Sequence, residues 1–309
     1  MSPLLSVVVV NWNTCELAVR CVESICEHFA STECEIIVVD NGSSDDSVAR
    51  LNALSLENLT VISLDDNLGF GCANNVGSEH AKGQYLLLLN SDTEVVDRSI
   101  LSLVQLLKDT PDVGIVTGDI YDGEGIRQRS CFSFFTFSQL VLDNSFRLIR
   151  RRAFDRAEKL PGCYDQEDGF VHEVDWVCGA FMLLNPQFIN PGDGNVFDKQ
   201  IFMYYEDALL CHRARREGYR VMHMTGVRIR HLHGQSSKKV KIKSILYRTA
   251  SSVRYVRATR GEPTATKYHR LLRGSWLFLL VVCKGLSAVS RSNKLSSKYE
   301  MFLRLYREV

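Results

Sequence analysis

The first 120 residues alternate between short apolar runs that end abruptly in polar residues and longer segments with apolar residues at helical spacing. The apolar runs predict strands at residues 6–10, 35–39, 59–64, 85–89 and 113–117. The periodic segments predict helices at residues 15–28, with Thr14 as N-cap, from about 72, and at 99–108. Strands alternating with helices indicate an α/β fold with a mostly parallel central sheet and helices on both faces.

The run at residues 85–89 contains four consecutive leucines and ends in Asn90-Ser91-Asp92-Thr93. In open α/β sheets, ligands bind beyond the carboxyl ends of the strands, so Asp92 is expected at the mouth of a crevice. A carboxylate there suits a hard divalent cation held against phosphate oxygens. The alternative is that these residues form a turn and the N-cap of a helix that starts near Arg98.

Further carboxylates stand where other predicted elements meet loops. Asp40 follows the strand at residues 35–39, and Glu206-Asp207 open a predicted helix. Each is weak by itself, because aspartate is a common cap or turn residue. Together with Asp92 they indicate sequence-remote carboxylates that converge on one edge of the sheet.

The pattern loosens after Gly118. Residues 119–170 combine a phenylalanine-rich stretch with three arginines at 150–152. They are interpreted as an irregular segment that covers or shapes the acceptor side of a cleft. The alternative is a solvent-exposed loop held in place by a few packed apolar side chains. A strand is expected again at residues 174–184, and Gly218 stops the following helix.

Composition and cysteine spacing narrow the class of protein. The 309 residues are 45% hydrophobic and 24% charged, which is typical of a globular protein and argues against extensive disorder. The ten cysteines lack the paired spacing of a structural zinc site. The amino terminus lacks the basic region of a secretion signal, so a cytoplasmic location with reduced cysteines is expected.

The net charge of +1 hides a strong asymmetry. Residues 228–309 contain 19 Lys+Arg and 3 Asp+Glu, a net charge of +16, whereas residues 1–227 contain 18 and 33, a net charge of −15. The basic end predicts contact with an anionic surface, either lipid headgroups or nucleic acid. Its cations surround an apolar run and match no nucleic-acid motif, which favours lipid.

That apolar run, residues 276–283, is far shorter than the roughly 20 residues that span a bilayer. Arg270, Arg273, Lys284 and Arg291 flank it. It therefore suits an interfacial helix that dips into one leaflet while the cations hold anionic lipid. The alternative is a helix buried against the preceding domain or against a second copy of the chain, so a homo-oligomer stays open.

Polar motifs follow one another in a fixed order between residues 5 and 236. They are Val8-Val9-Val10-Asn11-Trp12-Asn13, Val38-Val39-Asp40-Asn41-Gly42-Ser43-Ser44-Asp45, Asn67-Leu68-Gly69-Phe70-Gly71 with Asn74-Asn75, Leu88-Leu89-Asn90-Ser91-Asp92-Thr93, Trp176 with Gly179-Ala180, Tyr205-Glu206-Asp207, and His231-Leu232-His233-Gly234-Gln235-Ser236. In this order they resemble family 2 glycosyltransferases of the GT-A fold, within a branch of bacterial rhamnosyltransferase-like enzymes. The resemblance implies a catalytic domain at residues 1–236 and a basic helical extension at 237–309.

The resemblance also implies which residues bind the donor. Asp40 would hydrogen-bond the pyrimidine base of a nucleotide-sugar. Asp92 and His231 would hold a Mg²⁺ or Mn²⁺ ion bridged to the diphosphate, with His233 as the alternative to His231. The other donor-binding residues would be Asn11, Asn13, Asn67, Gly69, Phe70, Asn74, Asn90 and Ser91.

For catalysis, the resemblance implies that Asp207 is the general base, with Glu206 in support. Asp207 would deprotonate the acceptor hydroxyl for in-line attack with inversion at the anomeric carbon. A hydroxyl is a poor nucleophile at neutral pH, and a positioned base typically contributes about 10²–10⁴-fold in rate.

Three positions depart from the family pattern. Asn90 stands where many members have aspartate, so one carboxylate of the metal motif is missing. Leu209 replaces a further aspartate, which leaves the base role to Asp207. The loop at residues 191–198, which borders the acceptor in relatives, differs from the usual sequence.

The resulting prediction is an inverting, metal-dependent glycosyltransferase that acts in cell-surface polysaccharide biosynthesis, such as that of O-antigen. It would transfer L-rhamnose from dTDP-L-rhamnose to a polysaccharide or lipid-linked glycan, and a UDP-hexose donor is the alternative. Two further hypotheses are an inactive GT-A scaffold and a nucleic-acid-binding protein. The enzyme is expected to be peripheral on the inner face of the cytoplasmic membrane, with no nucleic-acid partner.

Overall fold

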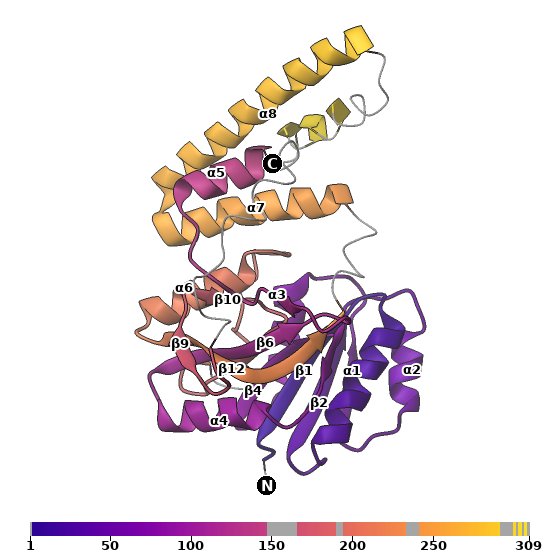
Figure 1. Cartoon of the computed structure of the whole chain (residues 1–309). Helices are drawn as coiled ribbons and strands as arrows, with labels where there is room; N and C mark the ends of the chain where they lie inside the picture. Colours follow the sequence, from indigo (N-terminus) through magenta and orange to yellow (C-terminus); the bar gives the residue numbers. More distant parts are fainter. Residues whose placement is uncertain are drawn as a thin grey trace. The chain divides into compact units, whose positions relative to one another are not determined.

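A computed structural model of the chain describes residues 2–146, 166–189, 194–232 and 241–290, with 299–300, 302–304 and 306–307 near the carboxyl terminus. It contains two compact units (Figure 1). The second unit contains α5 (Phe137–Phe146), α7 (Lys241–Arg260), α8 (Glu262–Ser290) and the short segment Met203–Tyr205. It therefore draws on more of the chain than the extension predicted at residues 237–309. The predicted features that lie outside the described residues are the arginines at 150–152, residues 190–193, the motif residues 233–236 and Arg291.

The first unit contains all the strands and the remaining helices. The strands are β1 (Leu5–Asn11), β2 (Cys34–Asp40), β3 (Leu59–Ser63), β4 (Tyr85–Asn90), β5 (Thr93–Val95), β6 (Val113–Tyr121), β7 (Arg127–Gln128), β8 (Cys131–Phe132), β9 (Val171–Glu173), β10 (Trp176–Val177), β11 (Phe181–Leu184) and β12 (Arg220–His231). The helices are α1 (Cys15–His28), α2 (Ser47–Ala53), α3 (Phe70–Glu79), α4 (Ile100–Asp109) and α6 (Glu206–Arg216).

The central sheet has the strand order β3-β2-β1-β4-β11-β6-β12-β5, with β7 beside β6 and β9 beside β12. Strands β3, β2, β1 and β4 are parallel, as predicted. The other half is mixed, because β11 lies antiparallel between β4 and β6 and β5 lies antiparallel to β12. The predicted α/β architecture is confirmed. One half of the sheet is wholly parallel, and in the mixed half only β6 and β12 pair in parallel among the described strands.

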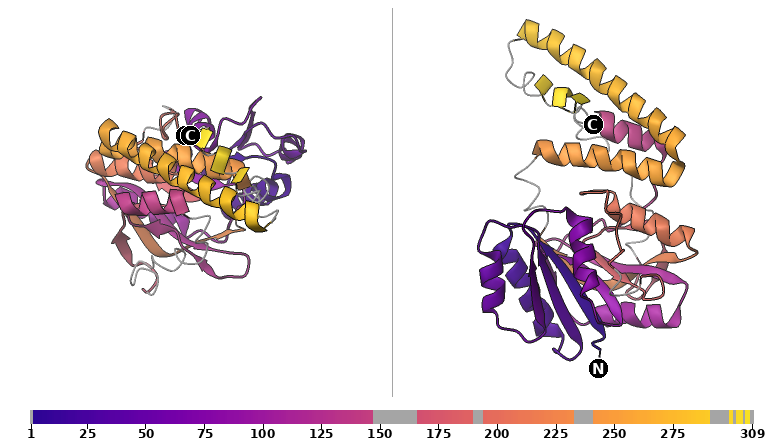
Figure 2. Two further views of the ribbon diagram at one scale, coloured as in Figure 1. Left: turned by 90° about the horizontal axis from the view of Figure 1, so that it is seen from above. Right: turned by 180° about the vertical axis from the view of Figure 1, so that it is seen from behind.

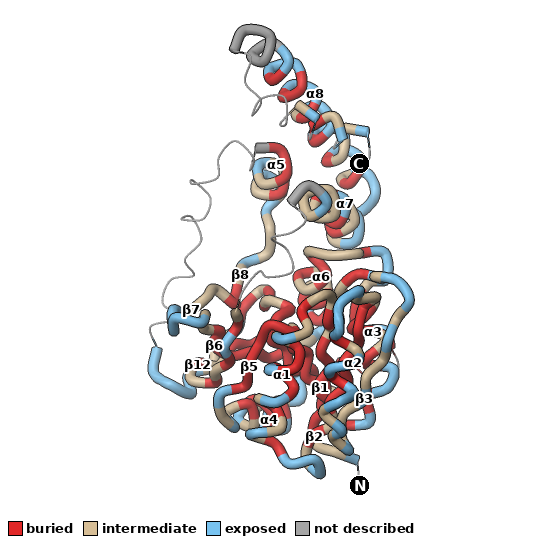
Figure 3. The backbone as a smooth tube through the Cα atoms, turned by 90° about the vertical axis from the view of Figure 1, so that its right-hand side faces the viewer, coloured by how far each residue is buried: buried red, intermediate tan, exposed pale blue. Residues whose placement is uncertain are grey.

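Alternate residues of β1 face helices on opposite sides of the sheet, because side chains alternate along a strand. Val7 and Val9 belong to the core cluster that includes the apolar residues of α1 and α4. Val8 faces α3, where a Cβ added at Gly77 would lie only 2.4 Å from a Val8 methyl carbon. Helices therefore cover both faces of a buried sheet (Figures 2 and 3).

Three local predictions are wrong. Residues 90–93 do not cap the following helix, because Thr93 starts β5 and Ser99 precedes α4. Residues 119–170 are not irregular throughout, since β6 extends into them and α5 is helical. Residues 174–184 form two short strands, β10 and β11, instead of one.

The second unit is built around large buried side chains of α7 and α8. Tyr255, Tyr268 and Trp276 are each at most 2% exposed. Asn144 of α5 donates from its amide to the hydroxyl groups of Tyr205 and Tyr268, at 3.1 Å in each case. The side chain of Asn144 thus ties the segment Met203–Tyr205 to the helices.

That segment is held in an unusual backbone conformation. Tyr204 and Tyr205 have φ angles of 70° and 67°, in the left-handed region that costs a bulky residue about 1–3 kcal/mol. The guanidinium of Arg248 lies 5.7 and 6.0 Å from their ring centroids, and the Tyr205 ring packs against Tyr255. Packing within the second unit therefore offsets the backbone strain at Tyr204 and Tyr205. These two residues directly precede Glu206 in the chain.

Candidate active site

The carboxyl ends of the parallel strands bring predicted site residues into one row. The strand register places Asn11 opposite Asp40, and Val10 opposite Asn90. The Asn11 amide donates to Asp40 Oδ2 at 2.8 Å, and the Ser43 N–H donates to Asp40 Oδ1 at 2.9 Å. Asp40 is only 1% exposed, so its carboxylate organises the loop after β2, and its contact with a base stays a prediction.

The same row extends to β4 through Thr14. Thr14 is the N-cap residue of α1, as predicted, but its hydroxyl makes no capping hydrogen bond to the helix. It donates instead to Asn11 Oδ1 at 2.7 Å and lies 3.0 Å from the Ser91 hydroxyl. Asn13, with a φ of 54°, accepts the Ser44 N–H at 2.8 Å. The ends of β1, β2 and β4 are thus joined by side-chain hydrogen bonds.

The loop before α3 is shaped by amides and by a glycine. Asn67 Oδ1 accepts from the Asn41 amide at 3.0 Å and from the Gly69 N–H at 2.9 Å. The Phe70 N–H donates to the Phe202 carbonyl at 2.9 Å. Gly69 has a φ of 88°, and an added Cβ would lie 2.2 Å from that carbonyl oxygen, so no other residue fits without a shift.

We expect Gly69→Ala to destabilise the protein more than Gly125→Ala. Both glycines have positive φ, which costs an alanine about 1–2 kcal/mol. Gly125 has no atom within 4 Å of an added Cβ, whereas Gly69 meets main chain, and overpacking of this kind costs about 1–3 kcal/mol more. Free energies of unfolding measured in urea test this difference, and equal losses would show that the close approach at Gly69 is not rigid.

Two asparagines of α3 form hydrogen bonds to main-chain groups close to this loop. Asn74 is 1% exposed, and its amide donates to the Phe70 carbonyl at 3.0 Å. Asn75 donates to the Phe197 carbonyl at 2.9 Å and accepts the Phe197 N–H at 2.8 Å. Asn74 therefore supports the loop from inside, and its predicted contact with the nucleotide-sugar stays a prediction.

Asp92 and His231 come together because β12 pairs with β5. The register places His231 opposite Thr93, and the Leu232 N–H donates to the Asp92 carbonyl at 2.8 Å. His231 Nε2 lies 3.1 Å from Asp92 Oδ1. Both side chains are largely buried, with exposed fractions of 7% and 11%. Two residues that are remote in the sequence thus form one polar pair at the end of the sheet.

The pair has the chemistry and the spacing of adjacent ligands on a divalent cation. Ligand bonds to Mg²⁺ are about 2.0–2.1 Å, so two neighbouring ligands of an octahedral ion lie about 3 Å apart. Asn90 adds a buried side-chain oxygen that has no hydrogen-bond partner among the described residues. Among the described residues, no group of three or more His, Cys, Asp or Glu side chains is placed to hold a metal, so the protein itself would supply only part of the ligand set. The residues therefore fit an ion that takes its remaining ligands from water and phosphate.

The Glu206-Asp207 pair opens α6 and faces the segment before β11. Asp207 Oδ2 accepts the Gly179 N–H at 3.2 Å, and Asp207 Oδ1 accepts the Ala208 N–H at 2.8 Å. An added Cβ at Gly179 would lie 3.2 Å from the Phe70 ring and 3.6 Å from Asp207 Cβ. The small residue therefore lets the start of α3 and the start of α6 approach the same point.

The two carboxyl groups of this pair differ in their surroundings. Burial, and then the charge of Asp207, raises the pKa of the Glu206 carboxyl well above its usual range. Its Oε2 has no hydrogen-bond partner within the part of the chain that is described. The environment thus favours a protonated Glu206 beside an Asp207 that is held by main-chain N–H groups.

Cys178 links the two acidic positions. Burial raises the pKa of its thiol to about 12, and the charges of Asp207 and Asp92 act in the same direction. Asp92 and Asp207 therefore lie within electrostatic range of one thiol, and their predicted shared site stays a prediction. The structure brings together most of the predicted residues, and His233 lies outside the described residues.

The chain belongs to the glycosyl transferase family 2, because the family model matches residues 6–174, more than half of its length. The match includes Asp40 and Asp92 and ends before Glu206. The predicted family is thus confirmed, and the rhamnosyltransferase-like branch stays a prediction.

Two curated relatives match parts of the chain. Glycosyltransferase GlyG of Streptococcus pneumoniae serotype 4 is 35% identical over 124 residues, 40% of each chain. Succinoglycan biosynthesis protein ExoO of Rhizobium meliloti is 30% identical over 148 residues, 45% of this chain and 41% of its own. This chain therefore spans about two fifths of the relatives it matches.

Solved structures share the fold at low sequence identity. The mannosyltransferase PcManGT from Pyrobaculum calidifontis, in complex with GDP-Man and Mn²⁺, has a TM-score of 0.53 at 15% identity over 99% of this chain and 85% of its own. GalNAc-T7 with UDP, GalNAc and Mn²⁺ has a TM-score of 0.59 at 16% identity over 82% and 48%. These likenesses confirm the predicted GT-A fold.

Proposed function

We propose that the protein is an inverting, metal-dependent glycosyltransferase of polysaccharide biosynthesis, with a nucleotide-sugar as donor. The observation that supports this most strongly is the Asp92–His231 pair between β4 and the end of β12, with Asp207 of α6 within electrostatic range of the same Cys178 thiol as Asp92. Family membership supports the reaction class. The names of ExoO and of the poly-β-1,6-N-acetyl-D-glucosamine synthase of Staphylococcus aureus, which is 24% identical over 188 residues, support the biosynthetic role.

In the proposed reaction, the acceptor oxygen attacks the anomeric carbon as the bond to the diphosphate breaks. Asp207 takes the proton of the acceptor hydroxyl, and the nucleoside diphosphate leaves with the bonding electrons. The Gly179 N–H holds Asp207 in place for this transfer. Asp92 and His231 would hold the divalent ion, which supplies positive charge to the leaving diphosphate when bound. The hydrogen-bonded ends of β1, β2 and β4 would hold the nucleotide.

We further propose dTDP-L-rhamnose as the donor, with a UDP-hexose as the alternative. The structural neighbours were solved with GDP-Man, with UDP and with UDP-GlcNAc, so the shared fold accommodates several nucleotides. Transfer from labelled dTDP-rhamnose and UDP-hexoses to a bacterial lipid-linked glycan fraction tests this. Label transferred only from a UDP-sugar would show that the donor is a UDP-hexose and not dTDP-L-rhamnose. No transfer from any donor would contradict the proposed activity.

We also propose that α8 attaches the enzyme to an anionic membrane surface, so that it acts on the inner face of the cytoplasmic membrane. Trp276, Leu279 and Leu280 of α8 are buried, while Phe278 and Val281 are 61% and 66% exposed. After its first residue, the sequence of α8 contains four basic residues and no acidic one. Figure 3 shows exposed stretches along this helix. An apolar face flanked by cations suits the interface of an anionic leaflet.

No helix in the described parts of the chain has the length and apolar content to cross a membrane. The proposed attachment is therefore tested as surface binding, by sedimentation with vesicles of phosphatidylcholine and phosphatidylglycerol. Phe278→Glu is expected to weaken binding by about tenfold or more, because burial of such a side chain is worth about 1.5–3 kcal/mol. Ile126→Glu, at the equally exposed Ile126 of the first unit, is the matched control. Equal binding of both variants would contradict attachment through α8.

A further inference from the structure

Gln128 lies at the end of the β6–β7 hairpin, where its side chain contacts His231 twice. The Gln128 amide Nε2 donates to the His231 carbonyl oxygen at 2.9 Å. Gln128 Oε1 lies 3.0 Å from His231 Nδ1. The hairpin places Gln128 opposite Ile120, and β6 pairs in turn with β12, which ends at His231. The fold thus brings Gln128 to the side of the imidazole that faces away from Asp92.

The two contacts determine which ring nitrogen carries a hydrogen. A main-chain carbonyl can only accept, so the amide nitrogen of Gln128 must face the His231 oxygen, and the amide oxygen must face Nδ1. That amide oxygen also can only accept, so Nδ1 must carry a hydrogen. The other ring nitrogen, Nε2, is the one that lies 3.1 Å from Asp92 Oδ1.

We propose that Gln128 is a positioning residue for the divalent ion: it holds His231 with Nδ1 protonated, so that Nε2 faces the ion beside Asp92. This inference rests on the proposed function, because it takes Asp92 and His231 as the ligands. Histidine ligands generally donate their second N–H to an oxygen acceptor, which fixes the tautomer and the ring orientation. Gln128 supplies such an acceptor and fixes the backbone of the same histidine.

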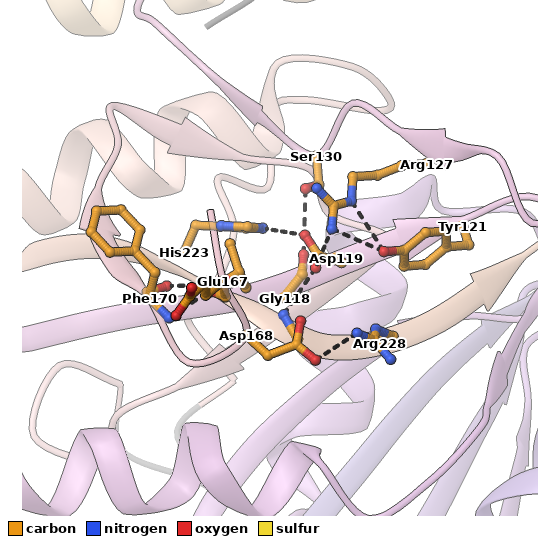
Figure 4. A network of polar contacts seen from close by, with 12 residues as sticks. Gly118, Asp119, Tyr121, Arg127, Ser130, Glu167, Asp168, Phe170, His223 and Arg228 are labelled. Atoms are coloured by element: carbon orange, nitrogen blue, oxygen red, sulfur yellow. Dashed lines mark hydrogen bonds and ion pairs between the residues drawn. The ribbon is translucent and has the colours of Figure 1, made fainter. Parts of the chain in front are cut away.

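A buried network stabilises the hairpin that carries Gln128 (Figure 4). The guanidinium of the adjacent Arg127 lies 3.2 Å from the carboxylate of Asp119, which is fully buried. Asp119 also accepts the Gly226 N–H at 3.0 Å and lies 3.1 Å from His223 Nε2. Burial opposes ionisation of Asp119, but the hydrogen bonds from His223 and Gly226 and the charge of Arg127 hold its pKa below its usual range. An ionised carboxylate beneath Arg127 therefore fixes the position from which Gln128 reaches His231.

The test compares two variants of the full-length protein by Mn²⁺ titration in the presence of dTDP or UDP, with free Mn²⁺ measured by electron paramagnetic resonance. Gln128→Leu removes both contacts and is expected to weaken Mn²⁺ binding by about 10–100-fold. Gln128→Glu keeps an acceptor for the Nδ1 hydrogen and is expected to lose far less. Gln105→Leu is the control, since Gln105 is an exposed residue of α4 whose side-chain amide donates to Asp109.

The outcomes separate this inference from the proposed function. If Gln128→Leu binds Mn²⁺ like the wild type, the positioning role is overturned while the metal site stands. If Gln128→Leu and Gln128→Glu lost equal Mn²⁺ affinity, only the contact of Gln128 with the His231 backbone would matter. That result would also overturn the positioning role. A wild-type protein that binds no Mn²⁺ with either nucleotide would overturn the metal site and this role together.

A second readout does not depend on the ion. Long-range ¹H–¹⁵N spectra of the metal-free protein, with the His231 signals assigned by comparison with His231→Gln, should show a protonated Nδ1 in the wild type. The Gln128→Leu variant should lose this preference while its thermal unfolding confirms that it is folded. An unprotonated Nδ1 in the wild type would contradict the proposal directly.

Discussion

Replacement of Asp207 by asparagine is expected to lower kcat for sugar transfer by about 10²–10⁴-fold, the usual contribution of a positioned general base. Asparagine has the same shape and keeps one oxygen that can accept the Gly179 N–H, while the hydrogen bond from the Ala208 N–H is lost, so thermal unfolding is measured alongside to confirm that the variant is folded. The asparagine amide cannot take a proton at neutral pH. Nucleotide binding should therefore be unchanged while turnover falls, and steady-state kinetics with saturating donor and acceptor measures this split.

The neighbouring carboxyl supplies a matched control for this prediction. Burial raises the pKa of Glu206, so glutamine resembles the protonated form that the site favours. Glu206→Gln is expected to lose much less activity than Asp207→Asn. If Asp207→Asn retained near-normal transfer, or if Glu206→Gln were the more damaging change, Asp207 would not be the base.

The second large effect is expected at the metal pair. Asp92→Asn removes the carboxylate that faces His231 Nε2 at 3.1 Å, and His231→Gln removes the imidazole. Loss of a direct ligand should weaken Mn²⁺ binding by at least the 10–100-fold or so that is typical for an outer-sphere partner. The double variant should lose little more than either single variant, because the two side chains act on one ion.

The control for the metal pair is Asp97→Asn. Asp97 accepts the Ser99 N–H at 2.7 Å before α4, and asparagine can retain that hydrogen bond while losing the same charge as Asp92→Asn. Mn²⁺ titration followed by electron paramagnetic resonance measures all four proteins. Additive losses for Asp92 and His231, or an equal loss in Asp97→Asn, would mean that the effect is general electrostatics and not coordination.

The sequence predicts the parallel half of the fold closely because its signals are local. The helix expected at residues 15–28 is α1 with the same bounds, and the apolar runs at residues 35–39 and 85–89 lie within β2 and β4. β2 and β4 are buried on both faces, so the apolar character of these strands stands out from the polar loops without any knowledge of the strand order.

In the mixed half, the runs at residues 113–117 and 174–184 predict strands where β6, β10 and β11 lie, but β12 and the strand order were not predicted, because the local signals are weaker. β12 contains Arg220, Arg228 and Arg230, which pair with acidic residues that are distant in the sequence. The alternation Val227-Arg228-Ile229-Arg230 was the available signal for a strand with one polar face. The insertion of β11 between β4 and β6 depends on long-range pairing, which no local pattern specifies.

Dependence on long-range strand pairing also separates the site residues that the sequence predicts from those that it misses. Asp92 and His231 are recognisable from their motifs, but their contact is created by the pairing of β5 with β12. Gln128 lies in a two-residue strand with no motif, and its role follows only from its hydrogen bonds to His231. Thr14 is predicted as a cap, and its bonds to Asn11 and Ser91 depend on the register of neighbouring strands.

The most direct test of the central claim is calorimetric titration of the wild-type protein with dTDP, UDP and GDP, each with and without Mn²⁺. A metal-bridged diphosphate at Asp92 and His231 predicts that at least one of these nucleotides binds tightly with Mn²⁺ and poorly without it. A preference for dTDP would agree with a rhamnosyl donor, and a preference for UDP would indicate a UDP-sugar. Absence of binding, or binding of equal strength without Mn²⁺, would contradict the metal-bridged donor site.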